Sequence, residues 1–131
     1  MQREITTLEP SSILVDGLKP TGRHMSNTKW RKFFMVVEGT GVAISSTQWK
    51  FVGEQKLYQW HGLPKTADLL EDRLEDGKWQ PVCYKDIEFI DIPAKSISPF
   101  SVTELIVEIS ASGRFPVVPT TDGLRIQAYE I

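Results

Sequence analysis

The spacing of the apolar residues changes from a helical to a strand period in the first half of the chain, and this change restricts the fold more than any other feature. Four large apolar residues recur at i, i+3, i+4 and i+7, the spacing of one helix face: Trp30, Phe33, Phe34 and Val37. Ser26 or Asn27 can cap this helix, because either side chain can accept a hydrogen bond from a free N–H group of the first turn. Gly39 and Gly41 follow and should end it. The sequence therefore predicts an amphipathic helix with one face in the core.

Three short segments after this helix have the composition of β-strands: 42–44, 48–52 and 56–60. Alternate side chains of a strand share a face, which pairs Trp49 with Phe51 and Tyr58 with Trp60. Aromatic side chains are well suited to a pleated, half-buried surface. We expect these segments to form a small antiparallel meander.

A second, shorter helix is predicted from Thr66 to about Glu75, with Thr66 as its N-cap. Leu70 and Leu74 are four residues apart and would lie on the same side of it. The Asp-Gly pair that ends at Gly77 should close the helix.

Two more strands are expected next. Residues 78–84 can form one, although Pro81 restricts it to the edge of a sheet. Residues 86–92 carry apolar side chains on both faces, which is typical of a central strand or of a strand with a β-bulge.

The last third of the chain has a strong helix start. Ser101 and Glu104 have the spacing of a capping box, in which each side chain bonds the backbone N–H of the other residue. Four apolar residues would then form the buried stripe: Val102, Leu105, Ile106 and Ile109. Gly113 is expected to end this third helix in a left-handed conformation.

Two final strands, 114–118 and 124–129, are separated by a turn with proline and Asp-Gly signals. The order of elements predicts an α+β fold, a single domain with a mainly antiparallel sheet and about three helices. The chain has 131 residues, 40% of them hydrophobic, which is enough for one domain. We expect residues 26–131 to form this domain, and residues 1–25 to be an N-terminal extension with one short strand at 13–15.

Composition excludes several classes of protein. With 15 basic and 17 acidic residues the net charge is −2, which excludes a generally basic nucleic-acid binder. No apolar run approaches the roughly 20 residues that a membrane span needs. Cys83 is the single cysteine, so no disulfide can form within the chain. We therefore expect a cytoplasmic protein with neither a nucleic-acid nor a membrane partner.

The residues that could support catalysis are few. His24, His61 and Cys83 are the only side chains with nitrogen or sulfur ligands of the kind zinc prefers, and their spacing fits no metal site. Cys83 is expected to be a small buried residue in a strand. The sequence has no Gly-x-Ser-x-Gly motif and no phosphate-binding glycine loop. We predict a protein that is not an enzyme and has no metal or cofactor, with a hydrolase that uses His61 and a nearby carboxylate as a lesser alternative.

Charge is distributed unevenly along the chain. Residues 1–65 hold 9 Lys and Arg against 5 Asp and Glu, whereas residues 66–131 hold 6 against 12. Clustered charge of one sign speeds association with an oppositely charged partner and helps to select it. The candidate partner-binding residues lie on the predicted 66–75 helix and just beyond it: Asp68, Glu71, Asp72, Glu75, Asp76 and Trp79. Tryptophan is common at binding hot spots, so Trp79 would be the apolar anchor. A solvated helix face is the alternative interpretation of the same residues.

Three runs of sequence are distinctive: Asn-Thr-Lys-Trp-Arg at 27–31, Trp-Lys-Phe at 49–51, and Tyr-Lys-Asp-Ile-Glu-Phe-Ile-Asp-Ile-Pro at 84–93. Together they resemble a family of small uncharacterised bacterial proteins, whose core opens with a similar Asn-Thr-Lys-Trp helix and ends near an Ile-Glu-aromatic-Ile strand. The resemblance covers about residues 26–93. It implies a fold and brings no catalytic residues with it.

In size, acidity and α+β make-up the chain is also similar in kind to the immunity proteins of bacterial toxin systems, including toxin–antitoxin pairs and contact-dependent inhibition. This resemblance implies a protein that neutralises a cognate toxin domain, such as a nuclease, by binding it through an acidic surface. The alternative is a small-ligand-binding or regulatory module in which aromatic side chains of residues 48–60 line a pocket.

Overall fold

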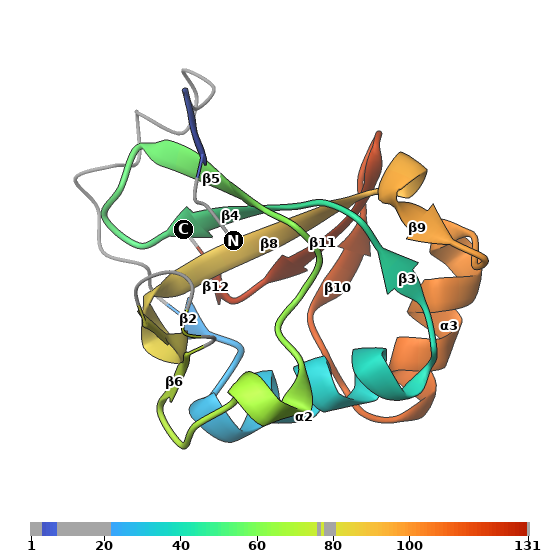
Figure 1. Ribbon diagram of the computed structural model, residues 1–131, viewed down its shortest axis with the longest axis horizontal. Coiled ribbons are helices and arrows are strands. Elements are labelled where there is room, and N and C mark those ends of the chain that lie inside the picture. The colour runs from blue at the N-terminus through green and yellow to red at the C-terminus, as the bar shows by residue number, and fades with distance from the viewer. Residues whose placement is uncertain (1–3, 8–21, 76, 78–80, 131) are drawn as a thin grey trace.

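The computed structural model describes residues 4–7, 22–75, 77 and 81–130 of the chain (Figure 1). Its largest element is a six-stranded sheet in which every neighbouring pair is antiparallel. In spatial order the strands are β1 (Glu4–Thr7), β5 (Lys56–Trp60), β4 (Thr47–Phe51), β8 (Ile87–Pro93), β11 (Gly123–Gln127) and β10 (Val117–Pro119). The predicted α+β class and the mainly antiparallel sheet are confirmed.

The part of the chain that the structure describes also forms three small two-stranded sheets. They are β2 (Gly22–Arg23) with β12 (Tyr129–Glu130), β3 (Ala43–Ile44) with β9 (Ile97–Ser98), and β6 (Arg73–Leu74) with β7 (Val82–Cys83). The predicted strand at 78–84 is therefore reduced to β7 within the described residues. The predicted strand at 124–129 is divided into β11 and β12.

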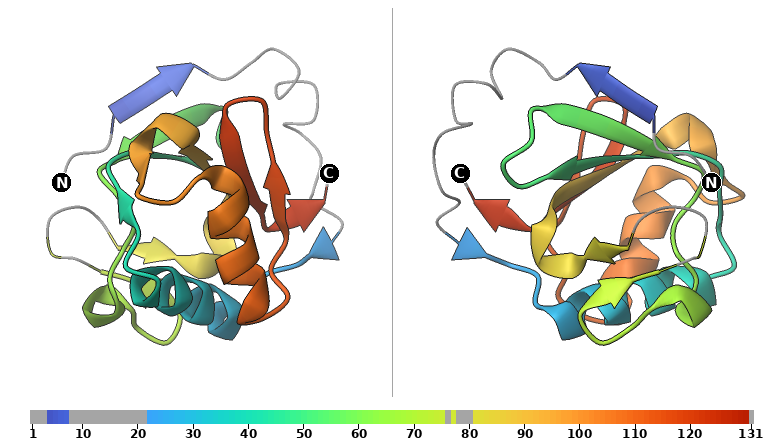
Figure 2. Two further views of the ribbon diagram at one scale, coloured as in Figure 1. Left: turned by 90° about the vertical axis from the view of Figure 1, so that its right-hand side faces the viewer. Right: turned by 60° about the vertical axis from the view of Figure 1, so that its left-hand side comes forward.

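Two α-helices pack on the sheet, α2 (Asn27–Gly39) and α3 (Val102–Ala111). Helix α2 lies across one face of the curved sheet, and α3 closes one end of it (Figures 1 and 2). The described residues also contain three single turns of 3-10 helix: η1 (Thr66–Asp68), η2 (Tyr84–Asp86) and η3 (Ala94–Ser96). Our expectation of about three helices is wrong, because the described residues contain two α-helices.

Helix α2 begins and ends as its sequence predicts. The Ser26 hydroxyl accepts a hydrogen bond from the Lys29 N–H at 3.1 Å and so caps the first turn. The four periodic apolar side chains are all buried: Trp30, Phe33, Phe34 and Val37. Gly41 has a φ of 77°, a left-handed conformation that glycine adopts without strain and that ends the helix.

Helix α3 has the predicted start but not the predicted end. The Glu104 N–H donates to the Ser101 hydroxyl at 3.1 Å, and the Ser101 N–H donates to the Glu104 carboxylate at 3.0 Å, which completes the capping box. The glycines with positive φ do not include Gly113, so the expected left-handed stop is wrong. A Cβ atom at Gly113 would lie 3.1 Å from the Phe115 ring, a tight contact that only a small shift of the ring would relieve.

A chain of aromatic rings connects α2 to the sheet. The ring centroid of Trp30 lies 5.4 Å from that of Phe34, which lies 6.1 Å from Trp49. Trp49 is in turn 4.7 Å from Trp60 on the neighbouring strand β5. Burial of a large apolar side chain contributes about 1.5–3 kcal/mol, so these rings form the centre of the core.

The predicted meander is correct for two of its three strands. β4 and β5 form the expected hairpin, with Trp49 opposite Tyr58. β3 instead leaves the hairpin and pairs with β9, where Ala43 lies opposite Ser98. The Ser45 N–H extends this pair by donating to the Ser96 carbonyl at 2.9 Å. No pattern within residues 42–60 could show a partner so distant in the sequence.

Strand β8 is both central and bulged, which explains its two apolar faces. It lies between β4 and β11 in the sheet. Lys50 of β4 pairs with Phe89, but the next residue of β4, Phe51, pairs with Ile87. Glu88 is therefore the extra residue of a β-bulge.

The helix predicted from Thr66 to about Glu75 does not form. Only η1 is helical there, and its N-cap is Lys65 instead of Thr66. Leu74 is fully buried whereas Leu70 is 40% exposed, so the two leucines do not share a face. Close like charges disfavour a short helix, and the pairing of this segment with itself and with β7 satisfies its backbone instead.

The first described residues of the chain, β1, belong to the large sheet. β1 pairs with β5 at the edge of the large sheet. The strand expected at 13–15 lies outside the described residues, and a domain boundary after residue 25 stays a prediction. Met25 is fully buried in the core.

Neither helix of the described residues combines the length and the apolar composition that crossing a bilayer requires.

Candidate functional site

Residues 68–75, which we call the acidic loop, form a tight hairpin. Leu69 and Leu74 pair as an isolated bridge. The Leu70 N–H donates to the Arg73 carbonyl at 2.8 Å, and the Glu75 N–H donates to the Asp68 carbonyl at 2.8 Å. The turn at the tip of this hairpin therefore presents Glu71 and Asp72, both of which are exposed.

Three bonds from other elements hold the acidic loop in place. The Arg31 guanidinium of α2 donates to the Glu71 carbonyl. The Tyr84 hydroxyl donates to the Leu70 carbonyl at 2.8 Å, and the Tyr84 N–H donates to the Asp72 carbonyl at 3.1 Å. Burial raises the pKa of Tyr84 to about 12. These bonds reach main-chain oxygens and leave the carboxylates at the surface.

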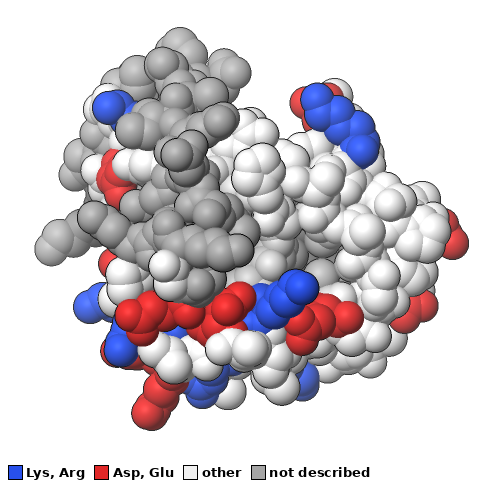
Figure 3. Space-filling model, viewed as in Figure 1, with Lys and Arg blue, Asp and Glu red and all other residues white. Residues whose placement is uncertain are grey.

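The predicted acidic residues are brought together, but Arg73 compensates part of their charge. An Asp72 carboxylate oxygen lies 2.8 Å from Arg73 Nη1, and a Glu75 oxygen lies 3.6 Å from Arg73 Nε. The Asp68 carboxylate accepts the Lys65 N–H at 3.0 Å. Arg73 is thus the single basic residue among the four acidic residues of 68–75, and it pairs with two of them. Figure 3 shows acidic side chains in a band below the sheet, with basic side chains among them. Asp76 and Trp79 lie outside the described residues.

His61 is exposed and lines a pocket of about 330 Å³ together with Glu38 and Lys65. Glu38 is engaged elsewhere, because its carboxylate accepts the Thr66 hydroxyl at 2.7 Å and the Thr66 N–H at 3.3 Å. These hydrogen bonds lower the pKa of Glu38. The arrangement offers no buried His–carboxylate pair for a hydrolase.

The other candidate chemical groups are scattered. Cys83 lies in a strand, β7, as expected, but it is partly exposed, so our expectation of a buried cysteine is wrong. Across the part of the chain that the structure describes, no three His, Cys, Asp or Glu side chains gather in a group that could hold a metal ion.

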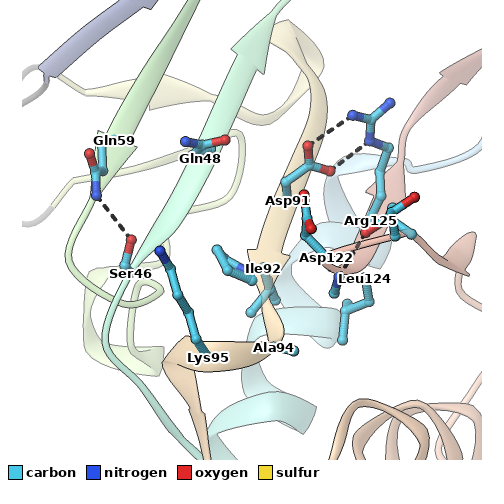
Figure 4. A pocket seen from close by; sticks show the side chains of 14 residues that line it. Ser46, Gln48, Gln59, Asp91, Ile92, Ala94, Lys95, Asp122, Leu124 and Arg125 are labelled. Atoms are coloured by element: carbon cyan, nitrogen blue, oxygen red, sulfur yellow. Dashed lines mark hydrogen bonds and ion pairs between the residues drawn. The ribbon is translucent and has the colours of Figure 1, made fainter.

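A second surface, which the sequence did not predict, lies on the face of the sheet opposite α2. Gln59 of β5 pairs with Gln48 of β4, Gln48 with Asp91 of β8, and Asp91 with Arg125 of β11. Four polar side chains therefore form one row across four strands (Figure 4). Alternation with Trp49 and Tyr58 places both glutamines on the outer face, but only the register shows that they lie in one row with Asp91 and Arg125.

This row is the floor of a groove of about 810 Å³, the polar groove. Three hydrogen bonds order its floor: Gln59 Nε2 donates to the Ser46 hydroxyl at 3.1 Å, and Arg125 donates to Asp91 through two nitrogens at 2.6 and 2.8 Å. The hydrogen bonds with Asp91 raise the pKa of Arg125 and keep it charged. The walls are η3, which carries Lys95, and the turn at 120–123 (Figure 4).

The aromatic residues that were expected to line a ligand pocket lie in the core instead. Trp49 is fully buried, Trp60 is 1% exposed and Phe51 is 3% exposed. Tyr58 is partly buried, and its hydroxyl donates to the Glu54 carboxylate. The pocket beside strands β4 and β5 is lined by the polar side chains of their opposite face.

Comparison with known proteins gives no relative for this chain: no family model matches the sequence, and no curated protein or solved structure is significantly similar to it.

Proposed function

We propose that this protein is a non-catalytic binding protein of the immunity type, which neutralises a cognate bacterial toxin domain by protein–protein contact. The acidic loop is the proposed contact surface, with Glu71 and Asp72 at its tip and Glu75 beside them. The proposal also includes Asp76 and Trp79 as flanking contacts.

The observation that carries this proposal is the way in which the acidic loop is presented. Its main chain is bonded to α2 through Arg31 and to η2 through Tyr84, so its shape is set before a partner arrives. The Asp72 side chain is nevertheless 60% exposed and that of Glu75 is 41% exposed. A preorganised, charged surface limits the entropy lost on association and favours fast encounter with a basic partner. A toxin that acts on nucleic acid has such a basic surface.

The ion pairs with Arg73 do not remove this electrostatic effect. They are exposed, and exposed pairs contribute little energy, about 0–1 kcal/mol, so a partner can exchange them readily. Two of the four carboxylates in the loop have no ion pair within the described residues, those of Asp68 and Glu71. The loop therefore keeps an excess of negative charge.

A charge-reversal experiment tests this proposal. The protein would be coupled to a surface, a partner recovered from the producing bacterium would be purified, and association rates would be measured at several salt concentrations. Changing Glu71, Asp72 and Glu75 to Lys should lower the association rate at low salt by about tenfold or more, since electrostatic steering changes such rates by 10–10³. The salt dependence should also weaken.

The control is Glu108→Lys, which reverses an exposed carboxylate on α3, away from the acidic loop. It should change the association rate much less than the triple variant. Equal rates and equal salt dependence for wild type and triple variant would show that the acidic loop is only a solvated surface.

A further inference from the structure

We propose that the polar groove is a binding site for a short, uncharged carbohydrate. The proposal does not depend on the proposed function. The groove is lined by side chains on the outer face of the sheet. The acidic loop lies beside α2, which covers the other face of the sheet (Figure 1).

Hydrogen bonds between backbone segments fix the walls of the groove, so the groove is more than a polar, solvent-facing surface of the sheet. The turn at 120–123 is closed by two bonds: the Gly123 N–H donates to the Thr120 hydroxyl at 3.0 Å, and the Thr120 N–H donates to the Gly123 carbonyl at 2.9 Å. The Ala94 N–H donates to the Asp122 carbonyl at 2.7 Å, which joins this turn to η3. The two walls are thus joined by a hydrogen bond beside the row of polar side chains.

Gly123 shows how closely this unit is packed. A Cβ atom at Gly123 would lie 2.0 Å from the Ile92 carbonyl oxygen, a distance that atoms cannot reach without displacement of the backbone. Only glycine lets β11 begin so close to the end of β8. The shape of the groove therefore depends on glycine at position 123.

The side chains in the groove fit a ligand with many hydroxyl groups. Ligand pockets are usually lined by apolar side chains, whereas this one is lined mainly by amides, hydroxyls and charged groups. The amide of Gln48 has no bonded partner among the described residues and lies in the centre of the row. An amide offers both donors and acceptors, which suits a hydroxyl group because a hydroxyl donates and accepts as well.

The charge of the groove favours an uncharged ligand. Two of its side chains are negative, Asp91 and Asp122, and two are positive, Lys95 and Arg125. Asp91 and Arg125 also neutralise each other through their double hydrogen bond. A phosphate or a polyamine would find no excess of opposite charge here. The volume of about 810 Å³ lies within the range of small-molecule sites, roughly 300–1,000 Å³.

Nuclear magnetic resonance of the full chain tests this proposal through the side-chain amide signals of Gln48 and Gln59. The probes are three trisaccharides, cellotriose, maltotriose and chitotriose, each titrated to millimolar concentration. We expect at least one of them to shift both amide signals in a saturable way. The backbone signals of the acidic loop should not move.

Gln48→Ala should weaken binding of that trisaccharide about tenfold, the effect of one lost hydrogen bond of about 1.4 kcal/mol. Gln59→Ala is a second groove variant with an expected loss of similar size. The matched control is Gln55→Ala in the exposed turn between β4 and β5, which should bind as the wild type does. The proposal is overturned if none of the three sugars shifts the amide signals, or if both groove variants bind as tightly as the control.

Discussion

Arg125 of β11 binds Asp91 of β8 through two parallel hydrogen bonds, and its guanidinium also lies over the Phe89 ring at 3.8 Å from the ring centroid. A planar guanidinium can make both contacts at once, whereas an ammonium cannot. One side chain thus joins two strands and covers an aromatic ring on the outer face of the sheet.

Arg125→Lys should therefore destabilise the protein although it keeps the charge. We expect a loss of ~1–2 kcal/mol in the free energy of unfolding, since the paired hydrogen bonds and the ring contact are both weakened. Urea unfolding measures it. Arg114→Lys, at an exposed position, is the matched control and should be neutral. Equal stability of the two variants would contradict this interpretation of Arg125.

Lys50 and Glu88 form a buried ion pair at 3.0 Å, with exposed fractions of 5% and 7%. Lys50→Met should lower the free energy of unfolding by about 3–5 kcal/mol, because the Glu88 carboxylate would stay buried without its partner. The double variant Lys50→Met, Glu88→Leu should be more stable than Lys50→Met alone. Additive losses in the two single variants and the double variant would show that the pair is not coupled.

Tyr84 should make stability fall in alkaline solution. Its pKa is about 12 in the folded protein against an ordinary 10.0, so the folded state holds a proton that the unfolded chain releases between these values. The free energy of unfolding should therefore decrease as the pH rises from 10 towards 12. Unfolding measured against pH would show this loss in the wild type.

Tyr84→Phe should remove most of the alkaline loss. At neutral pH it should be less stable than the wild type by about 1 kcal/mol, because the hydrogen bond to the Leu70 carbonyl is lost. An alkaline loss of the same size in both proteins would mean that another group is responsible.

The capping box of α3 predicts an acid-dependent contribution to stability. The Ser101 N–H lowers the pKa of Glu104 below its ordinary 4.5. The stabilisation is therefore complete above pH 4.5 and is lost as the pH falls through the lower pKa of the folded state. Thermal unfolding between neutral and acid pH should show this slope flattened in Glu104→Gln and unchanged in Glu108→Gln.

Ser101→Ala tests the other half of the same box. It removes the hydroxyl that accepts the Glu104 N–H and should destabilise the protein by about 1 kcal/mol at neutral pH. Urea unfolding is the measurement, with Ser110→Ala on the exposed side of α3 as the control. A neutral effect at Ser101 would show that solvent replaces the cap fully.

The two α-helices could be predicted because their signals are local. The cap at Ser26, the periodic rings from Trp30 to Val37 and the capping box at Ser101 all join residues within one or two turns. The acidic segment at 68–75 also has a helical leucine spacing, yet it forms a hairpin. The hairpin is bonded by Arg31 and Tyr84, which come from other parts of the chain and which no local pattern can show.

The sequence by itself determined which residues can cap, turn and be buried, since these properties arise from side chains and their near neighbours. The tertiary structure alone decided which strands became neighbours and in which register. Gln48 lies beside Asp91, and Lys50 beside Glu88 at a separation of 38 residues, only because β4 and β8 pair around a bulge. Strand pairing depends on the packing of whole faces, so the polar groove exists only in the folded protein.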